Sequence, residues 1–328
     1  VRKYFCSPYY HNPTKMRDFA SIWAYFTTLP EWKQYLIAGG ACYLLMKELA
    51  YLMRSQPTFA GKTVLITGVS SGIGEWLTYR FSQLGARLVL VGRKMSDLDR
   101  VANNCKNSDT VLKIEIDLAD PAETSRKLKK FIEDTKTEVD IVINNAGFVY
   151  RSMSKDIPFE EDVKMLNVNT TSVIAVTKAF LPQMMKRRSG QIVVTSSVAG
   201  LFPVPNTPMY CATKFGVQGF FNALRHEVAE FNIDVTLVCP GYIRTNISQK
   251  ARTASGDTYG KDDHDIAHGM TLDRFGPQAI QAIYDKRHEV VIAGLEESAG
   301  VFCSKWLPNF TKKILPFFGR MKREEYVQ

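Results

Sequence analysis

Three residues of types that can transfer a proton lie close together in the sequence: Ser197, Tyr210 and Lys214. Tyr210 and Lys214 are four residues apart in a stretch predicted to be helical, so their side chains share one face of the helix. A neighbouring ammonium favours the phenolate and lowers the pKa of a tyrosine from its usual value of about 10. The pair could therefore pass a proton to or from a substrate oxygen. Ser197, which follows a predicted strand, could hydrogen-bond the same oxygen as charge develops on it.

A glycine-rich segment between a predicted strand and a predicted helix could hold a pyrophosphate. It runs from Thr67 to Gly74 with the spacing G-x-x-x-G-x-G. Glycines let the backbone approach the phosphates, and the start of the helix offers unpaired N–H groups and a favourable dipole. The expected cofactor-binding residues here are Gly68, Ser70, Ser71, Gly72, Ile73 and Gly74.

A pyrophosphate held in such a turn can belong to NAD or to NADP, and the end of the second predicted strand indicates which of the two is bound. An acidic side chain at this place would hold the ribose 2′-hydroxyl of NAD, whereas a cation would meet the 2′-phosphate of NADP. The sequence has Gly92 followed by Arg93, so no acid is present and a cation is. We therefore predict NADP(H). The alternative is that Arg93 only lies on a solvated loop.

Two further strand ends carry residues of types suited to the same cofactor. Asp117 and Leu118 close the third predicted strand, where a doubly wound sheet brings a side chain beside the adenine. The segment Asn144-Asn145-Ala146-Gly147 ends the fourth, and its small residues would allow close approach to the middle of the cofactor. Asn145, Ala146 and Gly147 are the expected contacts.

These residues require a sheet that places the strand ends along one edge. Predicted strands, at 63–67, 87–91, 111–116, 140–144, 191–196, 234–239 and 289–293, alternate with helical stretches at 75–84, 121–136, 160–186 and 208–231. Alternation of this kind predicts an α/β fold: a doubly wound, mostly parallel, seven-stranded sheet with helices on both faces. The expected domains are an N-terminal extension (1–60), the sheet domain (61–300) and a basic, aromatic C-terminal segment (301–328). The polar stretch 247–270 is a candidate substrate lid.

Charge and cysteine usage exclude several classes of protein. The net charge is +9, and residues 1–60 and 301–328 together supply +8 of it. A nucleic-acid enzyme spreads basic charge along its folded body, so no nucleic-acid partner is expected. The six cysteines include no C-x-x-C pair and the five histidines have no ligand spacing, which predicts neither disulfides nor a metal.

Both ends of the chain have compositions that suit a membrane surface. The apolar run 35–46 continues to residue 53 after Lys47 and Glu48. It could be a marginal transmembrane helix, an interfacial hairpin, or a helix packed on the protein itself. Residues 301–323 interleave aromatic and cationic side chains. This segment could lie in a headgroup layer, or cover the substrate pocket or a dimer interface.

Taken together, the motifs resemble the short-chain dehydrogenase/reductase family over residues 60–295. The resemblance rests on the glycine turn, the segment Asn144–Gly147, Ser197 thirteen residues before Tyr210, Tyr210-x-x-x-Lys214, and Pro240-Gly241-x-Ile243-x-Thr245. It implies catalysis by Asn169, Ser197, Tyr210 and Lys214, with Asn169 holding a relay water and Ser197 contacting substrate. It also implies that Tyr210, Lys214, Pro240, Gly241, Ile243 and Thr245 contact the cofactor, Lys214 at the nicotinamide ribose and Thr245 at the carboxamide.

The segments Ser248–Ala251, Tyr259-Gly260 and Ile292–Leu295, together with the basic aromatic tail, resemble one membrane-anchored branch of this family, which is linked to the reduction of lipid-like ketones. The resemblance implies a lipophilic carbonyl substrate, a membrane surface as partner and, as one option, a homo-oligomer. The expected location is the endoplasmic reticulum or the peroxisome, with the mitochondrion as an alternative. A second hypothesis is that the chain binds NADP(H) but serves as a structural subunit of a larger membrane assembly. The intact residues Asn169, Ser197, Tyr210 and Lys214 favour the enzyme.

Overall fold

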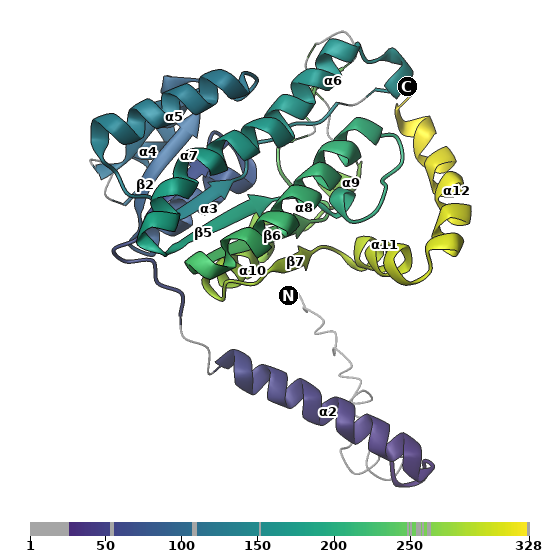
Figure 1. Cartoon of the computed structure of the whole chain (residues 1–328). Helices are drawn as coiled ribbons and strands as arrows, with labels where there is room; N and C mark the ends of the chain where they lie inside the picture. The colour runs from purple at the N-terminus through teal and green to yellow at the C-terminus, as the bar shows by residue number, and fades with distance from the viewer. Residues whose placement is uncertain are drawn as a thin grey trace, which may run out of the picture. The chain divides into compact units, whose positions relative to one another are not determined.

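A computed structural model describes residues 26–52, 56–106, 110–150, 152–247, 249, 251–253, 257, 259–260 and 264–326 (Figure 1). The chain divides into two compact units, residues 1–56 and 57–328. In the first unit the described residues form helix α2 (Glu31–Leu52), on which the aromatic side chains of Trp32 and Tyr35 are exposed. Within the described part of the chain, no helix is both long and apolar enough to cross a membrane.

The second unit is built on a seven-stranded, wholly parallel sheet with the order β3-β2-β1-β4-β5-β6-β7. The strands are β1 (Thr63–Thr67), β2 (Arg87–Gly92), β3 (Leu112–Glu115), β4 (Ile141–Asn144), β5 (Gly190–Thr195), β6 (Ile233–Pro240) and β7 (Glu289–Ile292). The predicted fold class is confirmed, and each strand lies within one residue of its predicted bounds at either end. The continuous apolar strands of the sequence are explained by burial on both faces.

Helices cover the two faces of the sheet (Figure 1). Residues from α3 (Gly72–Gln83), α4 (Met95–Asn103) and α10 (Leu272–Tyr284) pack on one face, and residues from α5 (Pro121–Thr135), α7 (Ser172–Arg187) and α8 (Pro208–Val228) pack on the other. Successive residues of β1 alternate between these layers, since Val64 and Ile66 belong to the first core and Leu65 to the second. Two apolar cores thus hold the sheet from both sides.

The single helix predicted for 160–186 is instead three consecutive pieces. Helix α6 (Phe159–Leu166) passes into a π-helical turn, η3 (Asn167–Thr171), before α7 begins. The Asn169 side chain both donates to the Phe148 carbonyl and accepts from the Phe148 amide, at 2.9 and 3.0 Å. A π-turn accommodates one extra residue per turn, which is a common device at functional sites.

The C-terminal segment is also more divided than the sequence suggests. Helix α11 (Leu295–Trp306) ends at Leu307, and α12 (Pro308–Tyr326) starts at the following proline. Proline disfavours a helical residue before it, and Leu307 accordingly has φ −130° and ψ 52°. The predicted domain boundary between residues 300 and 301 therefore lies inside α11.

The remaining short elements lie in the connections between these strands and helices. They are η2 (Ser154–Asp156), η4 (Val198–Gly200), η5 (Ala229–Phe231) and α9 (His264–Ala267). In the predicted lid, residues 248, 250, 254–256, 258 and 261–263 lie outside the described residues. The described part is held by backbone hydrogen bonds, including one from the Arg252 amide to the Val149 carbonyl at 3.3 Å. Its action as a lid stays a prediction.

Two glycines on different helices predict opposite effects of an added methyl group. A Cβ on Gly276 of α10 would lie 2.3 Å from the Trp76 ring of α3, whereas a Cβ on Gly219 of α8 would meet no atom within 4 Å. Gly276→Ala should lower the free energy of unfolding by about 1–3 kcal/mol through overpacking. Gly219→Ala should raise it by roughly 0.5–1 kcal/mol, because alanine loses less backbone entropy in a helix. Chemical denaturation of both variants tests the packing of α10 on α3, and equal effects would contradict it.

Candidate active site

The residues predicted to act together lie at the carboxyl ends of the parallel strands. The strand order reverses between β1 and β4, since the chain first runs outward to β2 and β3 and then returns to β4. In open α/β sheets this switch point forms the crevice in which ligands bind. The predicted residues that follow β1, β4, β5 and β6 therefore face a common region.

The glycine turn after β1 brings two stretches of backbone closer together than side chains would allow. Gly68 has φ +69°, and a Cβ there would lie 2.7 Å from the Cα of Ala146 after β4. A Cβ on Gly74 would lie 2.2 Å from the Gly68 carbonyl oxygen. Helix α3 begins at Gly72, and the side chain of its N-cap residue Ser71 makes no capping hydrogen bond. The first N–H groups of α3 are therefore not satisfied by this cap and suit a phosphate.

Thr67 and Asn145 fix the turn to the end of β4. The Thr67 hydroxyl oxygen accepts from the backbone amides of Asn145 and Ala146, both at 3.0 Å. The Asn145 side chain in turn donates to the Thr67 carbonyl at 3.1 Å and accepts from the Thr195 hydroxyl at 3.3 Å. The ends of β1, β4 and β5 are thus joined by side-chain hydrogen bonds. Thr67 was missed as a site residue, although it opens the glycine motif.

Helix α4 carries a cation to the same turn. Arg100 donates to the Ser70 carbonyl oxygen at 2.9 Å and forms an ion pair with Glu75 of α3 at 2.6 Å. The hydrogen bond to Glu75 raises the pKa of Arg100 further above its ordinary value. Arg93 is exposed immediately after β2. The sequence prediction identified Arg93 but not Arg100, because α4 was not predicted.

The end of β3 contributes one exposed and one buried residue. Asp117 is exposed, and its side chain accepts from the Ala119 amide at 3.0 Å. Leu118 is buried, and its carbonyl oxygen accepts from the hydroxyl of Ser172 at 2.6 Å. These two residues lie where the sequence predicts the adenine, two strands from the glycine turn.

Asn169 is fully buried in the π-turn and lies beside Lys214. A Cβ on Gly147 would be 3.3 Å from the Asn169 side-chain oxygen and 3.8 Å from the Lys214 ammonium nitrogen. The Thr170 hydroxyl donates to the Thr213 carbonyl at 3.0 Å, which fastens the π-turn to α8. The structure thus brings together Asn169, Gly147 and Lys214, which the sequence separates by at least 22 residues.

Lys214 is buried, and its ammonium lies close to Tyr210. Its Nζ is 5.7 Å from the centroid of the Tyr210 ring and donates to the Thr195 carbonyl oxygen at 2.9 Å. Burial lowers the pKa of Lys214 to about 8. A buried ammonium beside a phenol stabilises the phenolate. The Tyr210 hydroxyl can therefore give a proton to a substrate oxygen or take one up from it.

Ser197 follows β5 with an extended backbone, φ −169° and ψ 161°. Its hydroxyl oxygen accepts from the Ala199 amide at 3.1 Å, which caps the short helix η4. The hydroxyl hydrogen is not used in that bond, so it can be donated to a substrate oxygen. The capping bond fixes the direction of the side chain.

The segment after β6 is tied to β7 and to helix α11, which follows β7. The Gly241 amide donates to the Ile292 carbonyl at 3.0 Å, and the Tyr242 amide donates to the Glu297 carboxylate at 3.0 Å. Pro240 and Ile243 are buried. Thr245 meets the glycine turn, because a Cβ on Gly72 would lie 3.3 Å from its side chain. The chain after β6 therefore returns to the start of α3, and the contact of Thr245 with a cofactor stays a prediction.

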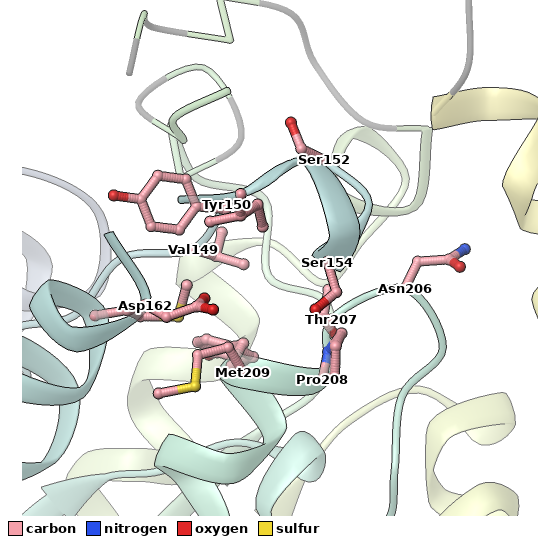
Figure 2. A pocket seen from close by; sticks show the side chains of 12 residues that line it. Val149, Tyr150, Ser152, Ser154, Asp162, Asn206, Thr207, Pro208 and Met209 are labelled. Atoms are coloured by element: carbon pink, nitrogen blue, oxygen red, sulfur yellow. The ribbon is translucent and has the colours of Figure 1, made fainter. Parts of the chain in front are cut away.

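A pocket opens beside Tyr210 (Figure 2). Its apolar and aromatic lining consists of Val149, Tyr150, Ile157, Met165, Pro208 and Met209. Its polar lining consists of Ser152, Ser154, Asp162, Asn206 and Thr207. A second, more open hollow shares Ser154, Asn206 and Pro208 with it and is lined further by Met153, Pro203, Val204, Pro205, Cys211, Ala212 and Phe215. None of these pocket residues except Tyr210 was named from the sequence, since nothing in their types or spacing marks them.

Among the residues that the structure describes, no group of three or more histidine, cysteine and acidic side chains could hold a metal. A nicotinamide dinucleotide fits the donor set better. The backbone cradle at Gly68 and Gly74 has no room for side chains, and the start of α3 faces it. These features match a pyrophosphate. The individual roles of the predicted contacts remain predictions.

Comparisons with known proteins agree with this assignment. The sequence profile described as short chain dehydrogenase matches residues 62–256. The chain is 38% identical over 260 residues to dehydrogenase/reductase SDR family protein 7-like of Drosophila melanogaster, covering 76% of this chain and 78% of that protein. It is 36% identical over 287 residues to dehydrogenase/reductase SDR family member 7B of Xenopus laevis, covering 85% and 88%. This is the branch that the loop after β6, residues 292–295 and the basic aromatic tail resemble.

Solved structures with the same fold hold nicotinamide cofactors. A short-chain dehydrogenase from Sphingobium yanoikuyae in complex with NADPH has a TM-score of 0.61 and 28% identity, covering 70% of this chain and 87% of that one. A short chain dehydrogenase/reductase from Burkholderia phymatum in complex with NAD has a TM-score of 0.63 and 22% identity, covering 72% and 90%, and shares the fold. The chain therefore belongs to the short-chain dehydrogenase/reductase family of nicotinamide-dependent oxidoreductases.

Proposed function

We propose that this protein is an NADP(H)-dependent reductase or dehydrogenase that interconverts a lipophilic ketone and its alcohol. The observation that carries the proposal is the buried Lys214 ammonium, 5.7 Å from the centroid of a Tyr210 ring that lines a pocket. Burial of a lysine ammonium costs free energy, and a protein keeps such a charge where it stabilises another group, as at an active site. Structural ion pairs are an alternative use of such a charge, but the described residues place no carboxylate in an ion pair with Lys214.

In the direction of reduction, the Tyr210 hydroxyl donates its proton to the substrate oxygen. Lys214 stabilises the phenolate that remains, and the Ser197 hydroxyl donates a hydrogen bond to the same oxygen. Asn169 anchors the π-turn against Lys214 and suits a relay of protons through water. The bound dinucleotide supplies the hydride in this direction and takes it up in the other.

The preference for NADP(H) rests on charge at the end of β2. Arg93 is exposed there and Gly92 carries no acid, while Arg100 brings a second cation to the adjacent turn. A 2′-phosphate requires cations, and a guanidinium binds it well. The solved neighbours include one in complex with NADPH and one in complex with NAD, so the proposed preference rests on the charges at the end of β2.

The lipophilic substrate class rests on the lining of the pocket and of the hollow beside it. Methionine, valine, isoleucine and proline side chains line the pocket beside Tyr210 together with five polar residues, and methionine, valine, proline and phenylalanine line most of the hollow next to it. Apolar walls with few polar groups favour an apolar ligand with one or two hydrogen-bonding atoms. The names of the relatives, dehydrogenase/reductase, agree with carbonyl or alcohol chemistry.

We also propose that both ends of the chain bind a membrane surface. On α11 and α12 the exposed side chains of Trp306, Phe310 and Phe317 alternate with the exposed cations Lys312 and Lys313. Exposed apolar anchors with cationic neighbours suit a layer of anionic headgroups. The exposed aromatic residues of α2 would add an anchor that depends less on charge. Endoplasmic reticulum or peroxisome is the proposed location, and a homo-oligomer is compatible with the fold.

Replacement of Arg93 tests the cofactor preference. The unmodified protein should bind NADPH more tightly than NADH, and Arg93→Ala should weaken NADPH by about tenfold or more while NADH changes little. Arg126→Ala, at an exposed position on α5, serves as the matched control. Titration of each protein with both cofactors by fluorescence measures the four affinities. Equal affinities in the unmodified protein would argue against the preference.

Removal of one hydroxyl tests the catalytic assignment. Tyr210→Phe keeps the ring and removes the transferable proton, so kcat should fall by about 10²–10⁴-fold while NADPH still binds. The measurement is NADPH oxidation with a panel of lipophilic ketones, together with the affinity for NADPH. Undiminished turnover would reject Tyr210 as the proton donor. A protein that binds NADPH but turns over no ketone at all would favour the structural-subunit hypothesis.

Paired substitutions in the full chain separate the two proposed membrane attachments. Lys312→Gln with Lys313→Gln should weaken binding to anionic vesicles by about fivefold per lysine at low salt and have little effect at high salt. Tyr35→Ser with Leu36→Ser should weaken binding at both salt concentrations. Lys129→Gln with Lys130→Gln, exposed on α5, is the charge-matched control. Vesicle sedimentation measures binding, and loss of binding by the control pair alone would contradict the assignment.

A further inference from the structure

Asp162 differs from its acidic neighbours in the first turn of α6. Glu160 is exposed to solvent, and Glu161 is paired with the Tyr150 hydroxyl and with Lys164. Asp162 has a buried carboxylate oxygen, Oδ1, with no hydrogen-bond partner among the described residues. A stabilising charge near the start of a helix does not require burial, so favourable interaction with the helix dipole does not explain this side chain.

The Asp162 side chain is directed into the pocket that holds Tyr210. Figure 2 shows its carboxylate pointing toward Met209 and Val149, on the wall opposite the segment that carries Ser154. Burial raises the pKa of Asp162. A buried acceptor without a partner destabilises the fold, and such atoms in native proteins call for an explanation. A ligand group that donates a hydrogen bond would remove this cost.

Among the described residues of this pocket, Asn206 also has a buried side-chain atom without a hydrogen-bond partner, its Nδ2. Its side chain points away from Asp162 in Figure 2, and its backbone is held at φ +62°. The two side chains therefore do not satisfy each other in this arrangement. A donor group on a molecule that enters the pocket would satisfy Asp162.

We propose that Asp162 is a specificity-determining residue that accepts a hydrogen bond from a hydroxyl group of the substrate, remote from the carbonyl that receives the proton of Tyr210. This inference rests on the proposed function and adds the chemical class to it: a lipophilic hydroxyketone or its diol. The apolar surroundings of the carboxylate favour a neutral donor over a cation, whose desolvation is costly. An anionic group, such as a carboxylate or phosphate, is excluded from this part of the pocket by repulsion and by its lack of a donor.

A series of methyl ketones of increasing chain length tests the proposal. Each length is prepared with a terminal methyl, hydroxyl or carboxylate group, and kcat/KM with NADPH is measured for the full chain. At one chain length the hydroxyl compound should exceed the methyl compound by about tenfold or more, as expected for a hydrogen bond to a charged group. Asp162→Leu should abolish this preference and improve turnover of the methyl compound. Asp162→Asn should keep an acceptor but admit the carboxylate compound.

Glu160→Gln, two residues before Asp162 in the first turn of α6 and exposed, is the matched control and should behave as the unmodified protein. NADPH affinity and the unfolding temperature of each variant report on folding; should Asp162→Leu not fold, the carboxylate discrimination of Asp162→Asn carries the test. An unchanged hydroxyl preference in Asp162→Leu, or no preference at any length in the unmodified protein, overturns the inference alone. Failure of the unmodified protein to reduce any compound, with NADPH bound, overturns the proposed function and the inference with it.

Discussion

The burial of one positive charge governs the arrangement of the site. Lys214 is buried, and its ammonium donates a hydrogen bond to the Thr195 carbonyl oxygen. This bond fixes the start of α8 relative to the end of β5. The Asn169 π-turn packs against the same group, and Gly147 leaves the space for both. Removal of the ammonium from water lowers the pKa of Lys214 to about 8, and the hydrogen bond to Thr195 keeps the amino group close to the Tyr210 ring.

Much of this architecture could be predicted from the sequence because the signals are local. Strands such as 63–67 are continuous apolar runs, and such runs arise when both faces of a parallel sheet are covered. The glycine turn could be recognised because the backbones of Gly68 and Ala146 approach so closely that position 68 has no room for a side chain. Once strands and motifs were in order, the positions of Ser197, Tyr210 and Lys214 at one edge followed from the topology.

Other parts of the site could not be predicted because they depend on contacts between distant residues. The π-turn at Asn169 arises from its hydrogen bonds to Phe148, which no helical periodicity reveals. Arg100 lies on a helix whose apolar pattern is short, and its role as a clamp on Ser70 requires the turn to be folded. Asp162 belongs to an acidic helix start in the sequence, and its buried oxygen becomes evident only when the pocket walls are assembled.

The hydrogen bond between Glu297 and the Tyr242 amide has a consequence for how the chain can be divided. Glu297 lies in α11, beyond the last strand, yet its carboxylate also fills the space beside Gly241 and Gly294. The segment that leads to Thr245 is therefore held in part by a helix outside the sheet. An exchange of terminal segments between relatives would have to transfer α11 together with the loop after β6, because the carboxylate on α11 and the backbone amide that it accepts from have to match.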